Sequence, residues 1–184
     1  MNTEIDTKVK RWQEMVIGLA KDGDEILSQN NKETAHRFHM ASALLGECAE
    51  LILWTDADNL IEEAGDIEFY FYGLQASCGM EAKLEAYHNE HGVELEILKN
   101  AEELFNLSKK EFIYGKEINW KDKQYTFNKF RTSLNSFYIE NNINLIDVYD
   151  FNYKKLGERY KGHKYTDEQA ISRNDKKDKQ NPDS

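Results

Sequence analysis

The segment HMASALLGECAELILWTDADNLIEEAGDIEFYFYGL, residues 39–74, decides the fold of this 184-residue chain. Its two halves have the apolar periodicity of helices, and they are separated by Thr-Asp-Ala-Asp at 55–58, residue types that favour caps over helix interiors. We expect helices over 33–54 and 59–77, the second of them stopping at Gly79. The four-residue connection predicts that these two helices are antiparallel neighbours.

The remainder of the chain has the same helical character. Its only proline is Pro182, so no residue before the C-terminal tail forbids a continuous helix. We therefore expect an all-α helix bundle that forms one domain over 1–171, followed by a polar, disordered tail over 172–184. The pattern predicts an amphipathic helix carrying Ile5, Val9, Trp12, Val16 and Leu19 and ending near Gly23, a polar helix over 81–113 interrupted at Gly92, a loop over 114–123, and helices over 124–140 and 144–161.

The overall charge excludes several classes of function. The chain has 34 Asp and Glu against 24 Lys and Arg, a net charge of −10, which opposes a sequence-independent grip on nucleic-acid phosphates. The chain contains no window of about 18 apolar residues, so we expect no membrane span. The first ten residues do not resemble a signal peptide. The two cysteines make no disulfide framework. We expect a cytoplasmic protein, in the host cytoplasm if it is phage-encoded, that binds neither nucleic acid nor membrane.

The stretch 38–82 is unusual because it contains nine carboxylates and no lysine or arginine. Two pairs stand out, Glu47-x-x-Glu50 and Glu63-x-x-Asp66, because each pair shares one face of its helix. On antiparallel neighbours these four carboxylates can converge. An all-oxygen set without histidine suits Mg²⁺, or Mn²⁺ as a substitute. The opposing interpretation is a solvated acidic helix face.

These motifs resemble a known family. The order Glu47-x-x-Glu50, twelve residues, Glu63-x-x-Asp66 resembles the signature of the MazG-like all-α nucleoside triphosphate pyrophosphohydrolases. The segments 39–51 and 59–74 resemble the two motif helices of that family. The C-terminal motif Asn152-x-x-Lys155-Leu156-x-x-Arg159-Tyr160 resembles that of the phage and bacterial branch. The resemblance covers about 39–75 and 144–175, and 81–143 is expected to hold a lineage-specific expansion.

The resemblance implies an activity. The family hydrolyses nucleoside triphosphates, or their deoxy forms, to the monophosphate and pyrophosphate with Mg²⁺, cleaving between the α and β phosphates. Glu47, Glu50, Glu63 and Asp66 are then the metal ligands and catalytic carboxylates, and either Glu47 or Glu50 is the general base. The family also implies a homodimer or homotetramer. The preferred base and sugar are left open.

Basic residues complement the acidic set. Asn152, Lys155 and Arg159 share one helix stripe, and segment 154–164 holds five bases and one acid. We expect these three side chains to bind the substrate, with Arg159 able to contact phosphate bidentately. The alternative is a basic C-terminal turn that only balances the helix dipole.

Three further residues are candidate substrate contacts. Asn59 lies on the same stripe as Glu63 and Asp66, although service as a helix N-cap would also explain it. Trp54 and Tyr70 lie one turn beyond the acidic stripes, where they could stack on a base. Packing in the core or at an interface is the more common explanation for aromatics at such positions.

Two other protein classes compete with the pyrophosphohydrolase. A di-iron carboxylate bundle needs two ExxH motifs, and Glu85-x-x-His88 is the only convincing candidate. An acidic helical interaction protein without catalysis would place its carboxylates on exposed, polar helices. The acids of 39–74 instead alternate with Leu, Ile, Phe and Tyr, which favours the enzyme.

Overall fold

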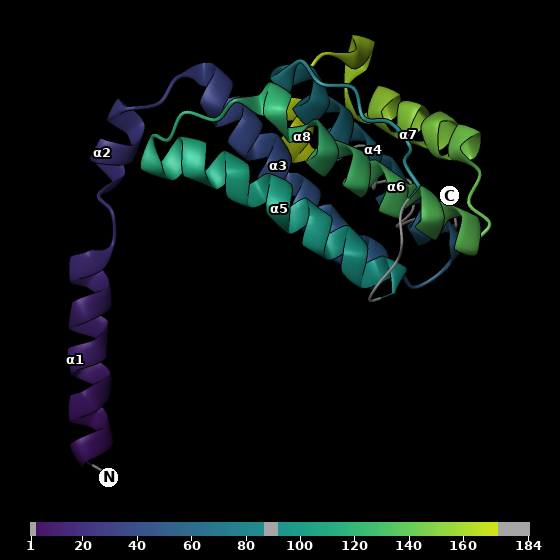
Figure 1. Ribbon diagram of the computed structural model, residues 1–184. Coiled ribbons are helices and arrows are strands. Elements are labelled where there is room, and N and C mark those ends of the chain that lie inside the picture. Colours follow the sequence, from purple (N-terminus) through teal and green to yellow (C-terminus); the bar gives the residue numbers. More distant parts are fainter. Residues whose placement is uncertain (1–2, 87–91, 173–184) are drawn as a thin grey trace.

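The computed structural model of the protein describes residues 3–86 and 92–172, and this part of the chain is helical with no strand. The prediction of an all-α fold is confirmed, while the tail expected over 173–184 lies outside the described residues. No described helix is long and apolar enough to cross a membrane. The elements are α1 (Thr3–Leu19), α2 (Gly23–Ser28), α3 (Lys32–Ile52), α4 (Ala57–Cys78), α5 (Val93–Tyr114), η1 (Trp120–Lys123), α6 (Gln124–Glu140), α7 (Leu145–Arg159), η2 (Lys161–His163) and α8 (Asp167–Ser172) (Figure 1).

Helices α3 and α4 form the predicted hairpin, and their ends are set by capping residues. Asn31 accepts a hydrogen bond from the Thr34 amide and so begins α3. Asp56 accepts from the Asn59 amide and begins α4. Gly79 ends α4 in the left-handed region at φ 63°, a conformation that glycine adopts without a steric penalty.

The buried face of α4 is the one that the sequence predicts, and that of α3 is predicted in part. Leu60, Ala64, Ile67, Phe71 and Leu74 are all buried. On α3 the periodicity predicts an apolar face of Leu45, Ala49 and Ile52, with Leu44, Cys48 and Leu51 adding to the apolar cover. The last three are buried, whereas Ala49 is exposed and Leu45 and Ile52 are only partly buried. Both α4 and α5 pack against α3. The buried arc of α3 therefore lies between the sides that face these two helices. That arc consists of Met40, Ala41, Leu44, Cys48 and Leu51.

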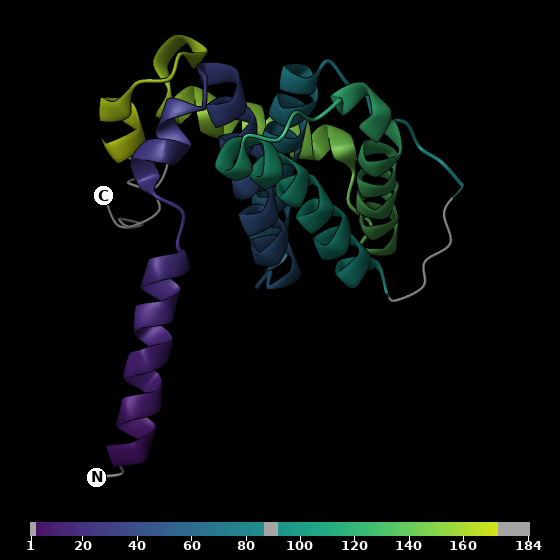
Figure 2. The same cartoon turned by 60° about the vertical axis from the view of Figure 1, so that its left-hand side comes forward.

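Helices α5 and α6 belong to the central core, although their sequence matches the family motifs only weakly. Helix α5 packs along α3, and α6 packs against α5 (Figures 1 and 2). Their fully buried side chains include Ile97, Leu104, Phe127 and Phe130, and Phe130 lies against Phe71 of α4 with 4.6 Å between ring centroids. The segment expected to be an expansion is therefore integral to the bundle.

The predicted helix over 81–113 is wrong in its first part, since 81–86 is not helical. Its backbone amides donate to side chains of neighbouring helices instead of to its own carbonyls. The Ala82 amide donates to Gln75 Oε1 at 2.6 Å, and the Glu85 amide donates to Thr132 Oγ1 at 3.0 Å. Because these side chains satisfy the donors, the segment can cross the bundle without forming a helix.

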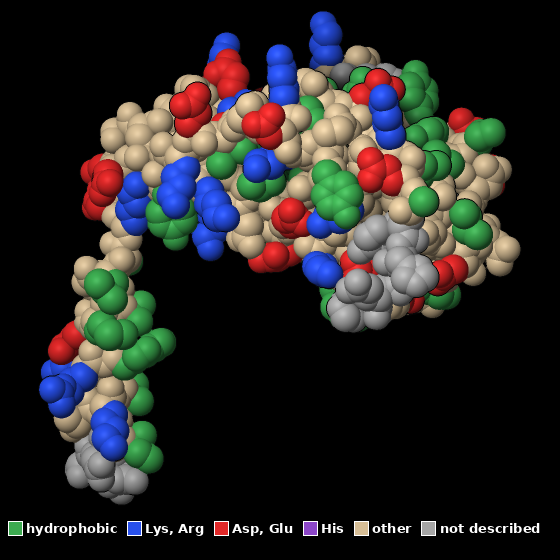
Figure 3. All heavy atoms as spheres, in the orientation of Figure 1, with side chains coloured by type: hydrophobic (Ala, Val, Ile, Leu, Met, Phe, Trp, Pro, Cys, Tyr) green, Lys and Arg blue, Asp and Glu red, His purple; other side chains and the backbone are tan. Residues whose placement is uncertain are grey.

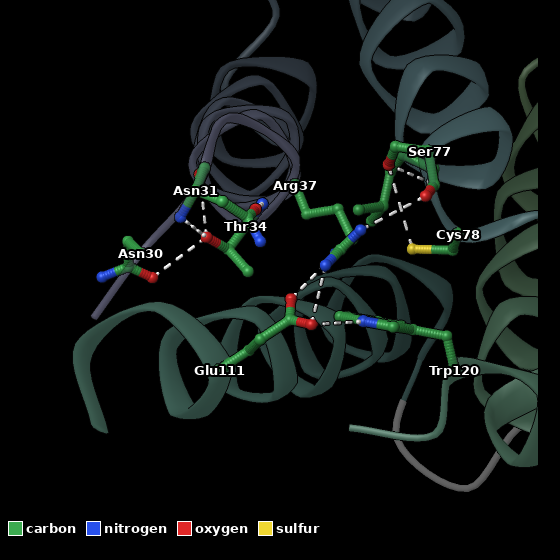
Figure 4. Close-up of polar contacts among 9 residues, drawn as sticks. Asn30, Asn31, Thr34, Arg37, Ser77, Cys78, Glu111 and Trp120 are labelled. Atoms are coloured by element: carbon green, nitrogen blue, oxygen red, sulfur yellow. Dashed lines mark hydrogen bonds and ion pairs between the residues drawn. The ribbon is translucent and has the colours of Figure 1, made fainter. Parts of the chain in front are cut away.

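A partly buried arginine, Arg37, fixes the lengthwise position of α3 against α5 (Figure 4). Arg37 donates two 2.8 Å hydrogen bonds to the Glu111 carboxylate, and Trp120 Nε1 donates to the same carboxylate at 3.2 Å. The bonds to Glu111 raise the pKa of Arg37. Such bidentate pairs fix orientation as well as contributing energy, so this pair sets the register of the helix that carries Glu47 and Glu50.

Helix α1 projects away from the bundle as an arm (Figures 1 and 2). It is joined through residues 20–22 to α2. The residues that follow α2 are anchored on the C-terminal end of α5, because Gln29 Nε2 donates to the Ile113 carbonyl at 3.0 Å and Asn30 Nδ2 donates to the Phe112 carbonyl at 2.7 Å. The anchor fixes the point from which the arm leaves the bundle.

Candidate functional site

A cavity of about 880 Å³ lies where α3, α4 and the C-terminal segment meet. Its acidic wall comes from α3 and α4, and its other wall comes from the end of α7 and the residues after it. The acidic lining residues are Glu47, Glu50, Glu62, Glu63 and Asp66, and the others are His36, His39, Met40, Phe69, Tyr70, Leu156, Arg159, Tyr160 and Tyr165.

Three of the predicted ligands form a compact cluster in this cavity. Each of Glu47, Glu50 and Glu63 offers a carboxylate oxygen, and these oxygens all lie within 4.8 Å of one another. Glu63 is buried, Glu47 is partly buried and Glu50 is exposed. Two come from α3 and one from α4, which is the convergence that the paired motifs predict. Clustered carboxylate oxygens are the donors that hard divalent cations prefer, so the residues present fit Mg²⁺ or Mn²⁺.

Burial and the charges of neighbouring carboxylates raise the pKa of two glutamates in this cluster. Burial, followed by the charges of Asp66, Glu50 and Glu63, raises the pKa of Glu47 to about 7. Burial and the Glu50 charge also raise the pKa of Glu63, although a hydrogen bond from Asn59 opposes the rise. A cation placed among these carboxylates would offset the repulsion and favour their ionised forms.

The fourth predicted ligand, Asp66, lines the same cavity but is held by α7. Lys155 Nζ lies 2.6 Å from Asp66 Oδ2 and 3.2 Å from Glu62 Oε1. Asn152 Nδ2 donates to Asp66 Oδ1 at 3.1 Å. Both oxygens of Asp66 therefore have partners from α7. Lys155 and Asn152 thus contact a carboxylate of the acidic wall, but neither is among the residues that line the cavity. Their binding of a substrate stays a prediction.

Asn59 positions Glu63. Its side-chain Nδ2 donates to Glu63 Oε1 at 2.7 Å, and its Oδ1 accepts from the Thr55 amide at 3.1 Å. The N-cap of α4 is Asp56, so the interpretation of Asn59 as the cap is wrong. A ligand oriented in this way by an amide loses less freedom when it binds a metal.

The remaining predicted contacts divide into two groups. Tyr70 and Arg159 line the cavity. Tyr70 packs edge-on against His39 with 6.0 Å between ring centroids, and burial raises its pKa. Trp54 follows the end of α3, is 42% exposed and is not among the lining residues. The structure therefore does not bring Trp54 to the site.

The lining residues that were not predicted as site residues are His36, His39, Met40, Glu62, Phe69, Leu156, Tyr160 and Tyr165. His36 had a usable signal, because it lies on the stripe that leads through His39 to Glu47. Glu62 directly precedes Glu63 in the sequence, and its carboxylate accepts a hydrogen bond from Lys155. Tyr165 had no such signal, because its position at the cavity depends on the turn at Gly162, where φ is 70°.

The cluster differs from a di-iron centre. Among the described residues it contains carboxylates and no histidine. Glu85 accepts a hydrogen bond from Asn128 of α6, and His88 lies outside the described residues. The arrangement fits a hard cation and, through Arg159 at the rim, an anionic ligand beside it.

Comparison of the chain with protein-family models, with curated proteins and with solved structures gave no match. A function for this chain is therefore inferred from its own side chains.

Proposed function

We propose that the chain is a Mg²⁺-dependent pyrophosphohydrolase of the MazG-like all-α type. It hydrolyses nucleoside triphosphates, or deoxynucleoside triphosphates, between the α and β phosphates to give the monophosphate and pyrophosphate. The observation that carries the proposal is the cluster of Glu47, Glu50 and Glu63, whose carboxylate oxygens lie within 4.8 Å of one another. The cavity of about 880 Å³ around it is in the usual range for small-molecule sites.

Glu47, Glu50 and Glu63 would hold the cation, with Asp66 beside them. When bound, Mg²⁺ or Mn²⁺ supplies charge neutralisation of phosphate oxygens and activation of water. The hydrogen bond from Asn59 keeps one oxygen of Glu63 in a fixed direction, so the ligand set is partly ordered before anything binds.

The acidic wall also supplies a proton acceptor. Hydrolysis needs a group that takes a proton from the attacking water while the anhydride bond breaks and pyrophosphate leaves. A carboxylate fills this role best when its pKa is near the working pH. Glu47 or Glu50 accepts the proton in this proposal. The raised pKa of Glu47 supports Glu47 as this proton acceptor in the metal-free site.

Cationic and aromatic side chains would hold the nucleotide. Arg159 lines the cavity and can bind phosphate oxygens bidentately. Lys155 is held by Asp66 and Glu62, so phosphate oxygens must compete with these carboxylates for its ammonium group. Tyr70, Tyr160 and Tyr165 line the cavity and offer ring faces to a base, which stacks on aromatic side chains without strict sequence preference.

The proposal includes a cytoplasmic homodimer or homotetramer, as in the family that the motifs resemble. The net charge of −10 supports the absence of nucleic-acid binding.

The test is a panel of nucleoside and deoxynucleoside triphosphates incubated with the protein and Mg²⁺, with monophosphate and pyrophosphate measured separately. Glu63→Gln should reduce turnover at least about tenfold, which corresponds to roughly 1.4 kcal/mol of barrier. Glu33→Gln is the matched control, because Glu33 is an exposed glutamate of α3 that lies outside the cavity lining. Equal turnover in EDTA, or equal turnover in both variants, contradicts the proposal. A purely acidic interaction protein would release no pyrophosphate from any of these substrates.

A further inference from the structure

Helix α1 exposes an apolar stripe that nothing in the described bundle covers. Its hydrophobic side chains at positions 5, 9, 12, 16 and 19 are between 43% and 76% exposed. Figure 3 shows hydrophobic side chains gathered along one edge of this arm. An isolated helix of 17 residues is only marginally stable in water, because most helix stability in proteins comes from packing of an amphipathic face. Within the described bundle, the stripe of α1 therefore lacks the packing that would stabilise this helix.

The spacing of the stripe identifies the kind of partner. Ile5, Val9, Trp12, Val16 and Leu19 are separated by four, three, four and three residues, which is the a and d pattern of two heptads. These a and d positions form the seam of a coiled coil. Of the other large apolar residues of α1, Met15 lies at g beside this seam and Ile17 lies at b, away from it.

We infer that α1 pairs with α1 of a second copy of this chain as a parallel, two-stranded coiled coil. The a positions are Val9 and Val16, and the d positions are Ile5, Trp12 and Leu19. β-Branched residues at a with leucine at d favour two parallel strands, and Val9, Val16 and Leu19 follow this pattern. An isologous pair of this kind closes on itself, because the same surface is used by both copies.

The charges of α1 agree with this pairing. Lys10, Arg11 and Glu14 lie at b, c and f, away from the seam. The flanking e and g positions hold one acid and one base, Asp6 and Lys8, together with Gln13 and Met15. In a parallel pair in register, g faces e of the other copy, so Lys8 lies near Gln13 and no like charges face each other across the seam.

The area is enough for a dimer that dissociates on dilution. Ten seam side chains, five from each copy, bury on the order of 1,000 Å² of apolar surface. This is the lower end of the range for specific protein interfaces. The pairing involves no residue of the acidic cavity and is independent of the proposed activity.

The experiment measures the mass of the full chain by light scattering and sedimentation over a concentration series. The neighbouring residues Val16 and Ile17 give a matched pair, since both are exposed hydrophobic residues but only Val16 is on the seam. Val16→Lys should raise the dimer dissociation constant at least about tenfold, because a lysine at one a position weakens a coiled coil. Ile17→Lys should leave that constant within about twofold. Unchanged thermal melting of the bundle in both variants establishes that each is folded.

Cysteine cross-linking tests the orientation. Val9→Cys should form an interchain disulfide in air, because a residues of parallel strands face each other, while Ile17→Cys and the unaltered chain should not. Antiparallel pairing would instead place position 9 opposite Trp12 and leave Val9→Cys unlinked. The inference is overturned by a monomer at every concentration, by a dimer that Val16→Lys does not weaken, by an unlinked Val9→Cys, or by a monomeric arm that binds lipid vesicles. Loss of hydrolysis in Glu63→Gln bears only on the proposed function.

Discussion

Lys155 Nζ lies 2.6 Å from Asp66 Oδ2, so that a cation from α7 already neutralises one of the four predicted metal ligands. The three glutamates of the cluster receive no such bond from this lysine among the hydrogen bonds described. The acidic wall is thus divided into a carboxylate held by a protein cation and a group of three glutamates. Within that group, burial and then the charges of Asp66, Glu50 and Glu63 raise the pKa of Glu47 to about 7.

Replacing Lys155 should destabilise the protein more than replacing its neighbour. Lys155 is 7% exposed and pairs with both Asp66 and Glu62. Removing one partner of a buried ion pair leaves uncompensated charge. We expect Lys155→Met to lower the free energy of unfolding in EDTA by about 2 kcal/mol, less than for a fully buried pair because Asp66 is partly solvated. Lys154→Met, at an exposed position, should change it by less than about 0.5 kcal/mol. Urea denaturation of both variants measures this, and equal stabilities would show that the ion pair contributes nothing.

Stability without metal should fall as pH rises through neutrality. The pKa of Glu47 is about 7 against an ordinary 4.5, so the native state keeps a proton that the unfolded chain loses above pH 4.5. The contribution of this group to stability is therefore complete below that pH, and it is lost as pH rises through about 7. Between pH 5.5 and 8 in EDTA we expect the wild type to lose about 1 kcal/mol relative to Glu47→Gln, after allowance for solvent screening. Urea denaturation at both pH values gives the comparison, and parallel pH profiles would refute it.

Metal affinity should depend on Asn59 although its side chain is not a ligand in the three-glutamate cluster. Its hydrogen bond to Glu63 holds one carboxylate oxygen in place. Loss of a partner of this kind lowers metal affinity by about 10–100-fold. We expect Asn59→Ala to weaken Mn²⁺ binding, measured by calorimetry or electron paramagnetic resonance, by at least about tenfold. Asp58→Ala alters an exposed acid one residue away and should have a smaller effect. Similar dissociation constants for the two variants would remove Asn59 from the site.

Two glycines should respond in opposite directions to the same substitution. A Cβ on Gly65 would lie 2.9 Å from both Cβ and Nδ2 of Asn152, whereas a Cβ on Gly46 would meet nothing within 4 Å. Gly46→Ala should stabilise the protein by up to about 1 kcal/mol through helix propensity. Gly65→Ala should destabilise it by about 1–3 kcal/mol, because α7 must shift away from α4.

The same shift should affect the site. Asn152 is the residue that the new methyl group would displace, and it donates to Asp66. Thermal melting of the two variants measures the difference in stability, and nucleotide hydrolysis measures the effect on the site. A gain in stability for Gly65→Ala would show that the contact between α4 and α7 is looser than described.

The helices and the acidic stripes could be predicted because their signals are local. Spacings of three and four residues place Glu47 with Glu50, and Leu60 with Ala64, on one face whatever surrounds the helix. The buried face of α3 was predicted only in part, because its centre depends on two neighbours, and the second of them, α5, begins at Val93. The extended path of 81–86 was missed for a related reason, since its hydrogen bonds go to Gln75 and to residues of α6.

The sequence by itself determined that this protein is helical, that α3 and α4 form a hairpin, and that each carries a pair of carboxylates on one face, because helix periodicity is a property of the local chain. Only the tertiary structure decided that Glu47, Glu50 and Glu63 share one cluster while Asp66 is bound to Lys155. That division depends on how α7 crosses α4 at Gly65. Contact between residues nearly ninety positions apart is set by the packing of the whole bundle and has no signature in the spacing of either segment.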